Sequence, residues 1–288
     1  MTATVLITAP QWAEAAQQRL RDAGLELLFM SGPVNEETLR QAFERQRIEG
    51  VVLRGSPPFT AQLMARAPHL RVIAKNGAGV DSVDLAAAAR LGIQVKVAAG
   101  ANANAVAEHA LALMLSLIRN LSTMDRQVRA GYWPPIAYQG RDFRGSVVGI
   151  LGFGSIGRQA AHLASCLGAQ VCVYRRPHQT LECAYETLDD LHAFLARVDI
   201  LSLHCPLNAQ TRGLIGEREL AAMKPGALLV NTARGPVVDE AALVAALQRG
   251  HLAGAGLDTF DVEPLDPQHA LLQLHQVVLT PHVAGMTS

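Results

Sequence analysis

One stretch near the middle of the chain constrains the fold more than any other. Residues 147–151 read Val-Val-Gly-Ile-Leu, a short apolar run that is typical of a buried strand. Gly152, Gly154 and Gly157 follow in the spacing G-x-G-x-x-G, and residues 156–167 then carry apolar side chains at a helical period. A strand, a glycine turn and a helix in this order bring a pyrophosphate to a helix N-terminus. The stretch therefore predicts a dinucleotide-binding site, whereas the glycines without these flanks would indicate an ordinary loop.

Each glycine has a physical role in such a site. Gly152 permits a tight turn off the strand, Gly154 leaves the backbone open to the pyrophosphate, and Gly157 lets the helix pack close to the strand. The N–H groups of Ser155 and Ile156, at the start of the helix, would face the anion. We therefore expect these five residues to bind the cofactor.

Composition excludes several classes of function. The 288 residues are enough for two domains, and 25 Lys and Arg balance 25 Asp and Glu, with no basic run to follow a nucleic-acid backbone. The chain does not open like a signal peptide, and its most apolar stretch, 105–118, is too short to cross a bilayer. Its four cysteines lack C-x-x-C spacing. We expect a cytoplasmic protein with reduced thiols and no metal, which binds neither nucleic acid nor membrane.

Strand and helix alternate along both halves of the chain. This rhythm predicts an α/β fold of two Rossmann-like, doubly wound parallel-sheet domains, the first of them flavodoxin-like. We place the boundary before a long apolar helix at 103–121, which is expected to continue helically to Trp133. Residues 1–98 would form the substrate domain and residues 99–282 the dinucleotide-binding domain. Residues 283–288, with a segment beyond them, would complete the first domain.

The end of the second strand in the dinucleotide unit bears on the choice of cofactor. An NAD site carries an Asp or Glu about 20 residues past the glycines, where it accepts hydrogen bonds from the ribose hydroxyls. Here the strand ends in Arg175 and Arg176, with no acid in place. Two guanidinium groups can pair with a 2′-phosphate, although they would also suit a solvated surface. The sequence therefore favours NADP over NAD.

Arg234, Glu263 and His282 each follow one of the last three predicted strands by a few residues. Parallel strands end at one edge of a sheet, so these side chains can converge where open α/β sheets place ligands. The arginine offers a fork for a carboxylate, the histidine can protonate a carbonyl oxygen as a hydride arrives, and the glutamate favours the protonated histidine. Each alone would be an ordinary loop residue, whereas the three in this order predict a catalytic site.

With these features, the chain resembles a known family, the D-isomer-specific 2-hydroxyacid dehydrogenases. The resemblance runs from about Gly50 to His282, nearly the whole chain. It is carried by seven motifs in the family's order: Val106-Ala107-Glu108-His109, Gly149 to Gly157, His204-Cys205-Pro206-Leu207 with Thr211, Met223 to Ala227, Asn231 to Gly235, Gly256-Leu257-Asp258, and Pro281-His282.

The resemblance implies a role for each matched residue. Arg234 would hold the carboxylate and carbonyl of a 2-oxoacid. His282 would be the general acid in reduction and the base in oxidation, with its pKa set by Glu263. Asp258 would hydrogen-bond the nicotinamide carboxamide.

Further residues would contact the cofactor or the substrate. The adenosine side would be lined by His204, Cys205 and Pro206 with Thr211 nearby; Thr232 and Ala233 would border the nicotinamide, and Gly285 would lie in the last cofactor loop. In the first domain, the loop of Asn76, Gly77, Ala78 and Gly79, with Arg54 close by, would bind the substrate carboxylate, although a plain turn would look the same.

The resemblance also implies a homodimer through 105–118 and the segment after it, although such an apolar helix could equally be buried within one subunit. Three departures from the family bear on function. Arg175 stands where NAD-using members have Asp. The sequence contains no regulatory domain after Ser288, so we expect no feedback control of the kind found in longer phosphoglycerate dehydrogenases. The family's C-terminal helix, which packs on the substrate domain, is also absent from the sequence.

These expectations describe an NAD(P)-dependent oxidoreductase that converts a small 2-oxoacid to a D-2-hydroxyacid, with glyoxylate or hydroxypyruvate as the first substrates to consider. Oxidation of 3-phosphoglycerate is the alternative within the enzyme class, with Arg54 and Lys75 as candidate phosphate ligands. A dinucleotide-sensing interaction protein, like the family's co-repressors, is the alternative from another class.

Overall fold

The computed structural model describes residues 2–55, 57–77, 79–133, 140–176, 180 and 182–287. The chain divides into two compact units, Met1–Ala101 and Asn102–Ser288. Residues 283–287, which we expected to complete the first domain, belong to the second unit, where the N–H groups of Val283 and Ala284 donate to Asp258. The two parallel sheets below confirm the predicted fold class.

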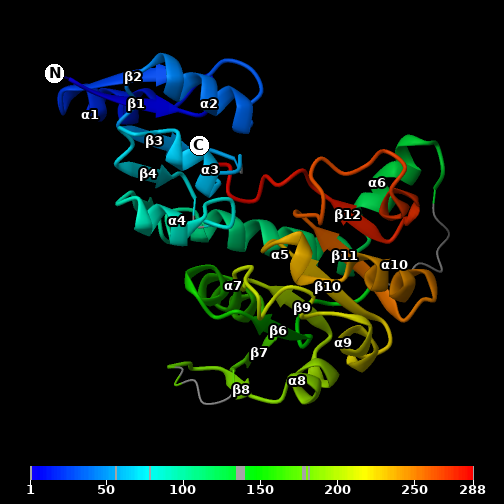
Figure 1. Ribbon diagram of the computed structural model, residues 1–288. Coiled ribbons are helices and arrows are strands. Elements are labelled where there is room, and N and C mark those ends of the chain that lie inside the picture. The colour runs from blue at the N-terminus through cyan, green and yellow to red at the C-terminus, as the bar shows by residue number, and fades with distance from the viewer. Residues whose placement is uncertain are drawn as a thin grey trace. The chain divides into compact units, whose positions relative to one another are not determined.

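The first unit is a five-stranded parallel sheet in the order β2-β1-β3-β4-β5, and a helix connects each strand to the next one along the chain (Figure 1). This 2-1-3-4-5 order is that of flavodoxin-like folds. Its elements are β1 (Ala3–Ile7), α1 (Glu14–Asp22), β2 (Leu25–Phe29), α2 (Glu36–Arg45), β3 (Gly50–Leu53), α3 (Ala61–Ala65), β4 (Val72–Lys75), α4 (Leu85–Arg90) and β5 (Gln94–Val97).

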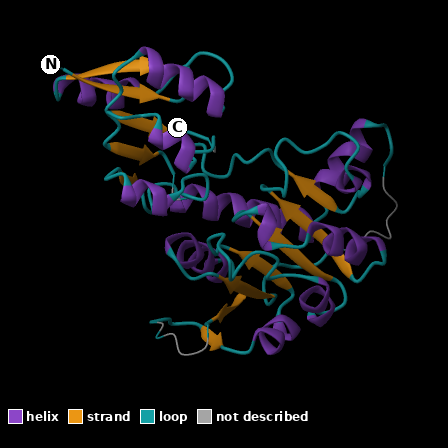
Figure 2. Cartoon of the chain, in the orientation of Figure 1, coloured by secondary structure: helices purple, strands orange, loops and turns teal. Residues whose placement is uncertain are grey.

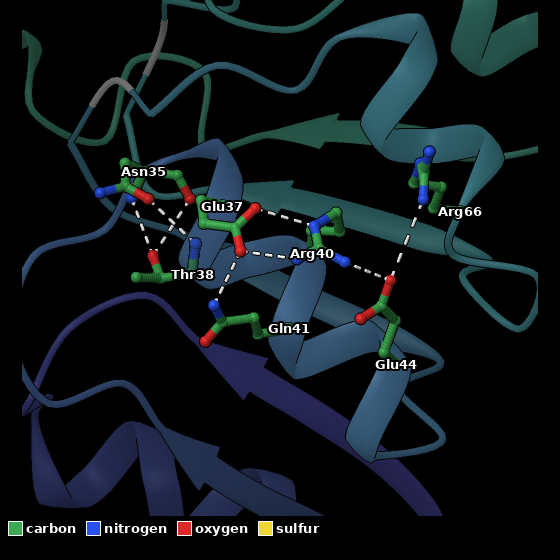
Figure 3. A network of polar contacts seen from close by, with 7 residues as sticks. All are labelled: Asn35, Glu37, Thr38, Arg40, Gln41, Glu44 and Arg66. Carbon is green, nitrogen blue, oxygen red and sulfur yellow. Dashed lines mark hydrogen bonds and ion pairs between the residues drawn. The ribbon is translucent and has the colours of Figure 1, made fainter.

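Helix α2 shows how local sequence sets an element of this unit (Figure 3). The side chain of Asn35 accepts a hydrogen bond from the Thr38 N–H at 2.9 Å, and the Thr38 hydroxyl accepts one from the Asn35 N–H at 3.0 Å. This capping box satisfies donors that a helix start leaves unpaired. One turn on, the Arg40 guanidinium binds both Glu37 and Glu44, and its hydrogen bond lowers the pKa of Glu37 to about 2. These ion pairs are exposed, so the cap contributes more to stability.

The second unit is a seven-stranded parallel sheet in the order β12-β11-β10-β9-β6-β7-β8. The chain starts in the middle of this sheet, at β6, and the direction of winding reverses between β6 and β9, which places a topological switch point there. The elements are α5 (Ala103–Ile118), α6 (Leu121–Arg129), β6 (Val147–Leu151), α7 (Ser155–Cys166), β7 (Gln170–Tyr174), β8 (Glu186–Leu188), α8 (Leu191–Arg197), β9 (Ile200–Leu203), α9 (Glu217–Ala222), β10 (Ala227–Asn231), the 3₁₀ turn Gly235–Val237, α10 (Glu240–Gln248), β11 (Leu252–Leu257), the 3₁₀ turn Ala270–Gln273 and β12 (Val277–Leu279).

Two apolar layers cover the two faces of this sheet, and Figure 2 shows helices flanking its strands. Alternate residues of each strand point to opposite faces, so Val148 and Ile150 of β6 pack with α5 and α7, while Leu151 packs with α8, α9 and α10. Gly149 faces the same layer as Leu151, and an added Cβ there would lie 2.3 Å from Val198. Both faces are covered, as an all-parallel sheet requires, and the strand ends are left to carry function.

Two local features differ from the sequence-based expectation. The helix predicted to run unbroken to Trp133 is two helices, because Asn120 adopts a left-handed conformation (φ 50°) between α5 and α6. The short strand β8 was not foreseen; its three residues carry too little pattern to distinguish them from a loop. In the described part of the chain, none of the helices has the length and apolar character that a bilayer-spanning helix needs.

Candidate active site

The glycine turn lies at the switch point, directly against the end of β9. Gly152 has φ 102°, and an added Cβ there would lie 2.4 Å from the backbone nitrogen of Cys205. At Gly157 a Cβ would lie 2.0 Å from the carbonyl oxygen of Gly152, so the helix packs onto the turn without room for a side chain. Gly154 has no atom within 4 Å of its Cβ position. The turn is thus closed on two sides and open at Gly154, beside the start of α7. The first N–H groups of a helix have no partner within the helix and can bind an anion.

Three buried polar atoms at the ends of β9, β10 and β11 have no hydrogen-bond partner within the described residues. They are His204 Nδ1, Thr232 Oγ1 and Thr259 Oγ1. Buried polar groups are normally paired, so orphans along one edge of a sheet fit a polar ligand such as a dinucleotide. The sequence pattern does not single out Thr259, because a threonine near the end of a strand is common.

His204 and its neighbours form a rigid strand end. The His204 Nε2 lies 2.9 Å from the Ser202 hydroxyl, and burial lowers the pKa of His204 to about 4, so the ring is neutral at physiological pH. Burial also raises the pKa of the Cys205 thiol to about 11, which excludes a thiolate nucleophile. The Thr211 hydroxyl donates to the Pro206 carbonyl at 2.6 Å and closes the following turn. These residues provide fixed walls rather than reacting groups.

The arginine pair lies at the end of β7, with an acidic neighbour that the sequence did not reveal. The guanidinium of Arg175 forms an ion pair with Asp189 at 2.8 Å, and Arg176 donates to the Gln210 side chain at 3.4 Å. Asp189 follows β8, which pairs with β7 and carries this carboxylate to Arg175. Asp189 is 14 residues from Arg175 in sequence, so the residues next to the arginines give no sign of it.

Glu263 and His282 meet as the sequence predicts. Glu263 Oε2 lies 2.8 Å from His282 Nδ1, and its Oε1 accepts the Phe260 N–H at 3.1 Å. Burial raises the pKa of Glu263, but the hydrogen bonds from His282 and Phe260 and the charge of Arg234 outweigh it and hold this pKa below its usual range. The carboxylate is therefore ionised and can orient the His282 ring through Nδ1.

Arg234 is held beside this pair by a close backbone contact. The side chain of Asn231 accepts the Ala233 N–H at 3.0 Å and donates to the Arg234 carbonyl at 2.9 Å, which sets the turn. An added Cβ on Gly235 would lie 1.9 Å from the carbonyl carbon of Phe260, so the Arg234 turn packs directly on the loop that carries Glu263. The ends of β10, β11 and β12 thus bring the three predicted catalytic residues into one neighbourhood.

An apolar cavity of about 520 Å³ adjoins the histidine–glutamate pair. Its walls are Phe260, Glu263, Pro264, Leu265, Leu272, Leu279, Thr280, Pro281 and His282. Apolar walls lower the local dielectric and strengthen the attraction between the two polar side chains. No group of three or more potential metal ligands is found among the described residues.

Asp258 and Gly285 anchor the last loop. Asp258 is 1% exposed and accepts hydrogen bonds from the Thr280 hydroxyl and from the N–H groups of Val283 and Ala284. A Cβ on Gly285 would lie 2.5 Å from Asn102 Nδ2, at the start of α5. Contact of Asp258 and Gly285 with a cofactor stays a prediction.

The predicted substrate loop lies in the first unit. Arg54 and Asn76 follow the paired strands β3 and β4, and Gly77 has φ 145°. The Arg54 guanidinium donates to the Gln11 carbonyl at 3.0 Å. Ala78, which follows Gly77, lies outside the described residues, and Gly79 is the last residue of the predicted loop.

A doubly wound sheet with a glycine turn at its switch point defines a dinucleotide-binding α/β protein, and comparison with known proteins specifies the family. The family model for the "D-isomer specific 2-hydroxyacid dehydrogenase, NAD binding domain" matches residues 111–284. The D-3-phosphoglycerate dehydrogenase of Archaeoglobus fulgidus is 37% identical over 98% of this chain and 53% of its own, so the chain spans about half the length of that relative.

Two further similar proteins support the same family assignment. The glyoxylate reductase of Aeropyrum pernix is 41% identical over 78% of this chain and 70% of its own. The crystal structure of a glyoxylate reductase from Paecilomyes thermophila superposes with a TM-score of 0.89 at 31% identity, covering 99% of this chain and 90% of that one. The chain belongs to the D-isomer-specific 2-hydroxyacid dehydrogenase family.

The glycine turn predicts opposite outcomes for two matched substitutions. Gly157→Ala should destabilise the fold by about 1–3 kcal/mol, because its Cβ would overlap the Gly152 carbonyl. Gly154→Ala should change stability by less than about 0.5 kcal/mol, because its Cβ would meet open space. Urea unfolding of both variants measures this difference, and equal effects would contradict the packing described for the turn.

His204 predicts an acid-sensitive stability. Its pKa is about 4 in the folded chain and about 6.5 in the unfolded chain, so only the unfolded chain takes up the proton as pH falls between these values. The contribution of His204 is present above pH 6.5 and is lost on the way to pH 4. Between pH 7 and pH 4.5, wild type should lose on the order of 2 kcal/mol more unfolding free energy than His204→Gln. Parallel losses in the two proteins would show that this ring titrates normally.

Proposed function

We propose that this chain is an NAD(P)-dependent dehydrogenase that interconverts a small 2-oxoacid and the D-2-hydroxyacid. The observation that supports this most directly is the 2.8 Å contact between Glu263 and His282, beside Arg234 and on the same sheet edge as the glycine turn. An acid–base pair, a carboxylate fork and a dinucleotide turn are the parts that reduction of a 2-oxoacid requires.

Each residue of the proposed site has a role that follows from its chemistry. A bound nicotinamide would supply or accept the hydride at C2. The Arg234 guanidinium pairs with the substrate carboxylate and orients the carbonyl carbon. His282 donates a proton to the carbonyl oxygen in reduction and removes it in oxidation, while ionised Glu263 fixes the ring through Nδ1 and leaves Nε2 for the substrate.

The proposal also includes the other contacts predicted with the cofactor and the substrate. Gly152, Gly154, Ser155, Ile156 and Gly157 would hold the pyrophosphate. His204, Cys205, Pro206 and Thr211 would line the adenosine side, and Thr232, Ala233, Asp258 and Gly285 the nicotinamide side; the orphaned atoms of His204 and Thr232 support these assignments. Residues 1–98 would act as the substrate domain, with Arg54 and Asn76 to Gly79 binding the carboxylate.

Glyoxylate and hydroxypyruvate are the substrates that we propose first. 3-Phosphoglycerate is the second candidate, supported by the relative from Archaeoglobus fulgidus. A phosphate would need additional cations near the carboxylate loop, but Lys75 is 8% exposed and donates to the Gly55 carbonyl, and Arg54 donates to Gln11. These internal contacts favour the smaller oxoacids.

Turnover with a substrate panel tests the proposal. Glyoxylate, hydroxypyruvate, pyruvate and 3-phosphohydroxypyruvate are each assayed with NADPH and NADH. At least one should be reduced, and His282→Ala should lower kcat by about 100-fold or more, because it removes the proton donor. The matched control is His192→Ala, which removes another histidine paired with a glutamate, 3.6 Å from Glu219, on helix α8.

Two results would overturn the proposal. One is the absence of turnover across the panel, which would favour the dinucleotide-sensing alternative. The other is a His282→Ala variant that keeps wild-type kcat on a substrate that wild type reduces.

We propose that NADP is the preferred cofactor. Arg175 and Arg176 stand at the end of β7, where NAD sites use an acid. The ion pair with Asp189 restrains Arg175 in the free protein, so a 2′-phosphate would compete with that carboxylate for the guanidinium.

Charge reversal tests the cofactor proposal. Arg175→Asp should lower kcat/KM for NADPH by about 10-fold or more relative to NADH, because it replaces an attraction for the 2′-phosphate by a repulsion. Arg249→Asp makes the same charge change on an exposed residue after α10 and should leave the ratio unchanged. An unchanged ratio in Arg175→Asp would remove the argument for NADP.

We also propose a cytoplasmic homodimer. The four cysteines are free thiols, as expected in a reducing compartment. Helix α6 buries none of its residues, and Leu121 and Val128 on it are 55% and 48% exposed. An apolar surface of this kind supports association with a second copy of the chain.

A further inference from the structure

Helix α5 packs on β11 in a register that two glycines make possible. A Cβ on Gly254 would lie 3.2 Å from Leu117, and a Cβ on Gly256 would lie 3.0 Å from Leu113. Four helical residues rise about 6 Å, and two strand residues rise about 6.6 Å, so the two elements keep pace as they run in opposite directions. The next pair in this register is His109 on α5 opposite Asp258, just beyond the end of β11.

The structure contains this next contact as a hydrogen-bonded chain. The Thr280 hydroxyl donates to Asp258 Oδ1 at 2.6 Å, and His109 Nε2 lies 3.0 Å from the same hydroxyl oxygen and 3.6 Å from Asp258 Oδ1. A hydroxyl has one proton to donate, and Thr280 gives it to the carboxylate. His109 must therefore be the donor to Thr280, through a protonated Nε2.

The far end of this chain controls the turn at His282. Asp258 accepts the N–H groups of Val283 and Ala284 at 2.9 Å each, in addition to the Thr280 hydroxyl. One buried carboxylate thus binds the Thr280 side chain before His282 and the backbone after it. The φ of His282, 55°, lies in the left-handed region that a residue with a side chain rarely adopts. Such a conformation persists only where its surroundings impose it.

We propose that His109 is a positioning residue of the active site, which acts through Thr280 and Asp258 to hold the backbone turn that presents His282. Its N–H fixes the Thr280 hydroxyl as an acceptor toward α5 and a donor toward the carboxylate, so the hydroxyl and the carboxylate both have hydrogen-bond partners. Without that donor, the hydroxyl is free to rotate away, and the carboxylate loses one of its hydrogen-bond donors. The catalytic consequence rests on the proposed function, whereas the structural consequence does not.

Two substitutions of His109 separate the hydrogen bond from the bulk of the ring. Gln keeps an N–H donor at a position similar to Nε2, and Leu fills the space without a donor. Glu108→Gln is the control on the same helix, because Glu108 is exposed and bonds only Asn104 among the described residues. Thr280→Val and Thr280→Ser repeat the comparison at the middle of the chain, should His109→Leu fail to fold.

Hydrogen exchange of the peptide spanning 280–287 is the structural readout, and it needs no turnover. His109→Leu and Thr280→Val should speed exchange of the Val283 and Ala284 amides by about 10-fold or more, and His109→Gln, Thr280→Ser and Glu108→Gln should stay within about threefold of wild type. Equal exchange in wild type and His109→Leu would overturn the proposal, as would a His109→Gln variant as loose as His109→Leu.

Steady-state kinetics is the second readout. With a substrate that wild type reduces, His109→Leu should lower kcat by about 10-fold with less than about a twofold change in KM for the dinucleotide, and His109→Gln should restore kcat. An unchanged kcat in His109→Leu would overturn the positioning role. If wild type reduces nothing, the proposed function fails, and hydrogen exchange alone decides whether His109 holds the turn.

Discussion

The candidate active site depends on one buried carboxylate. Asp258 is almost inaccessible to solvent, and a polar group in that position is stable only with hydrogen-bond partners around it. Three donors to it come from the segment Thr280–Ala284: the Thr280 hydroxyl and the N–H groups of Val283 and Ala284. The need to satisfy Asp258 therefore folds this segment over the end of β11 and places His282 against Glu263. The burial of one polar group thus determines where His282 lies.

Close backbone approach is the second constraint on the site. Glycines stand where elements touch without room for a side chain: Gly152 against β9, Gly157 against the turn, and Gly235 against the loop of Glu263. These backbone contacts fix the loops at the strand ends relative to one another. Gly154 is different, because the space above it is open, as a pyrophosphate would need.

Much of this could be predicted from sequence, because the signals are local. The glycine turn, the alternating elements and the order of Arg234, Glu263 and His282 are all visible in short stretches, and the structure brings the three residues together. Asp189 could not be foreseen beside Arg175, since it arrives on a strand too short to recognise. The break at Asn120 depends on one left-handed residue that no periodicity reveals. The chain from His109 to Asp258 joins residues 149 positions apart in sequence and appears only when α5 lies on β11.

The most direct test of the account is the fate of the hydride and the handedness of the product. The protein is incubated with hydroxypyruvate and NADPH deuterated at the transferable C4 position, and the glycerate formed is analysed by mass spectrometry and chiral chromatography. The account predicts D-glycerate with deuterium at C2. Glycerate without deuterium, or the L-isomer, would contradict the arrangement of dinucleotide turn, Arg234 and His282 on which the proposed function rests.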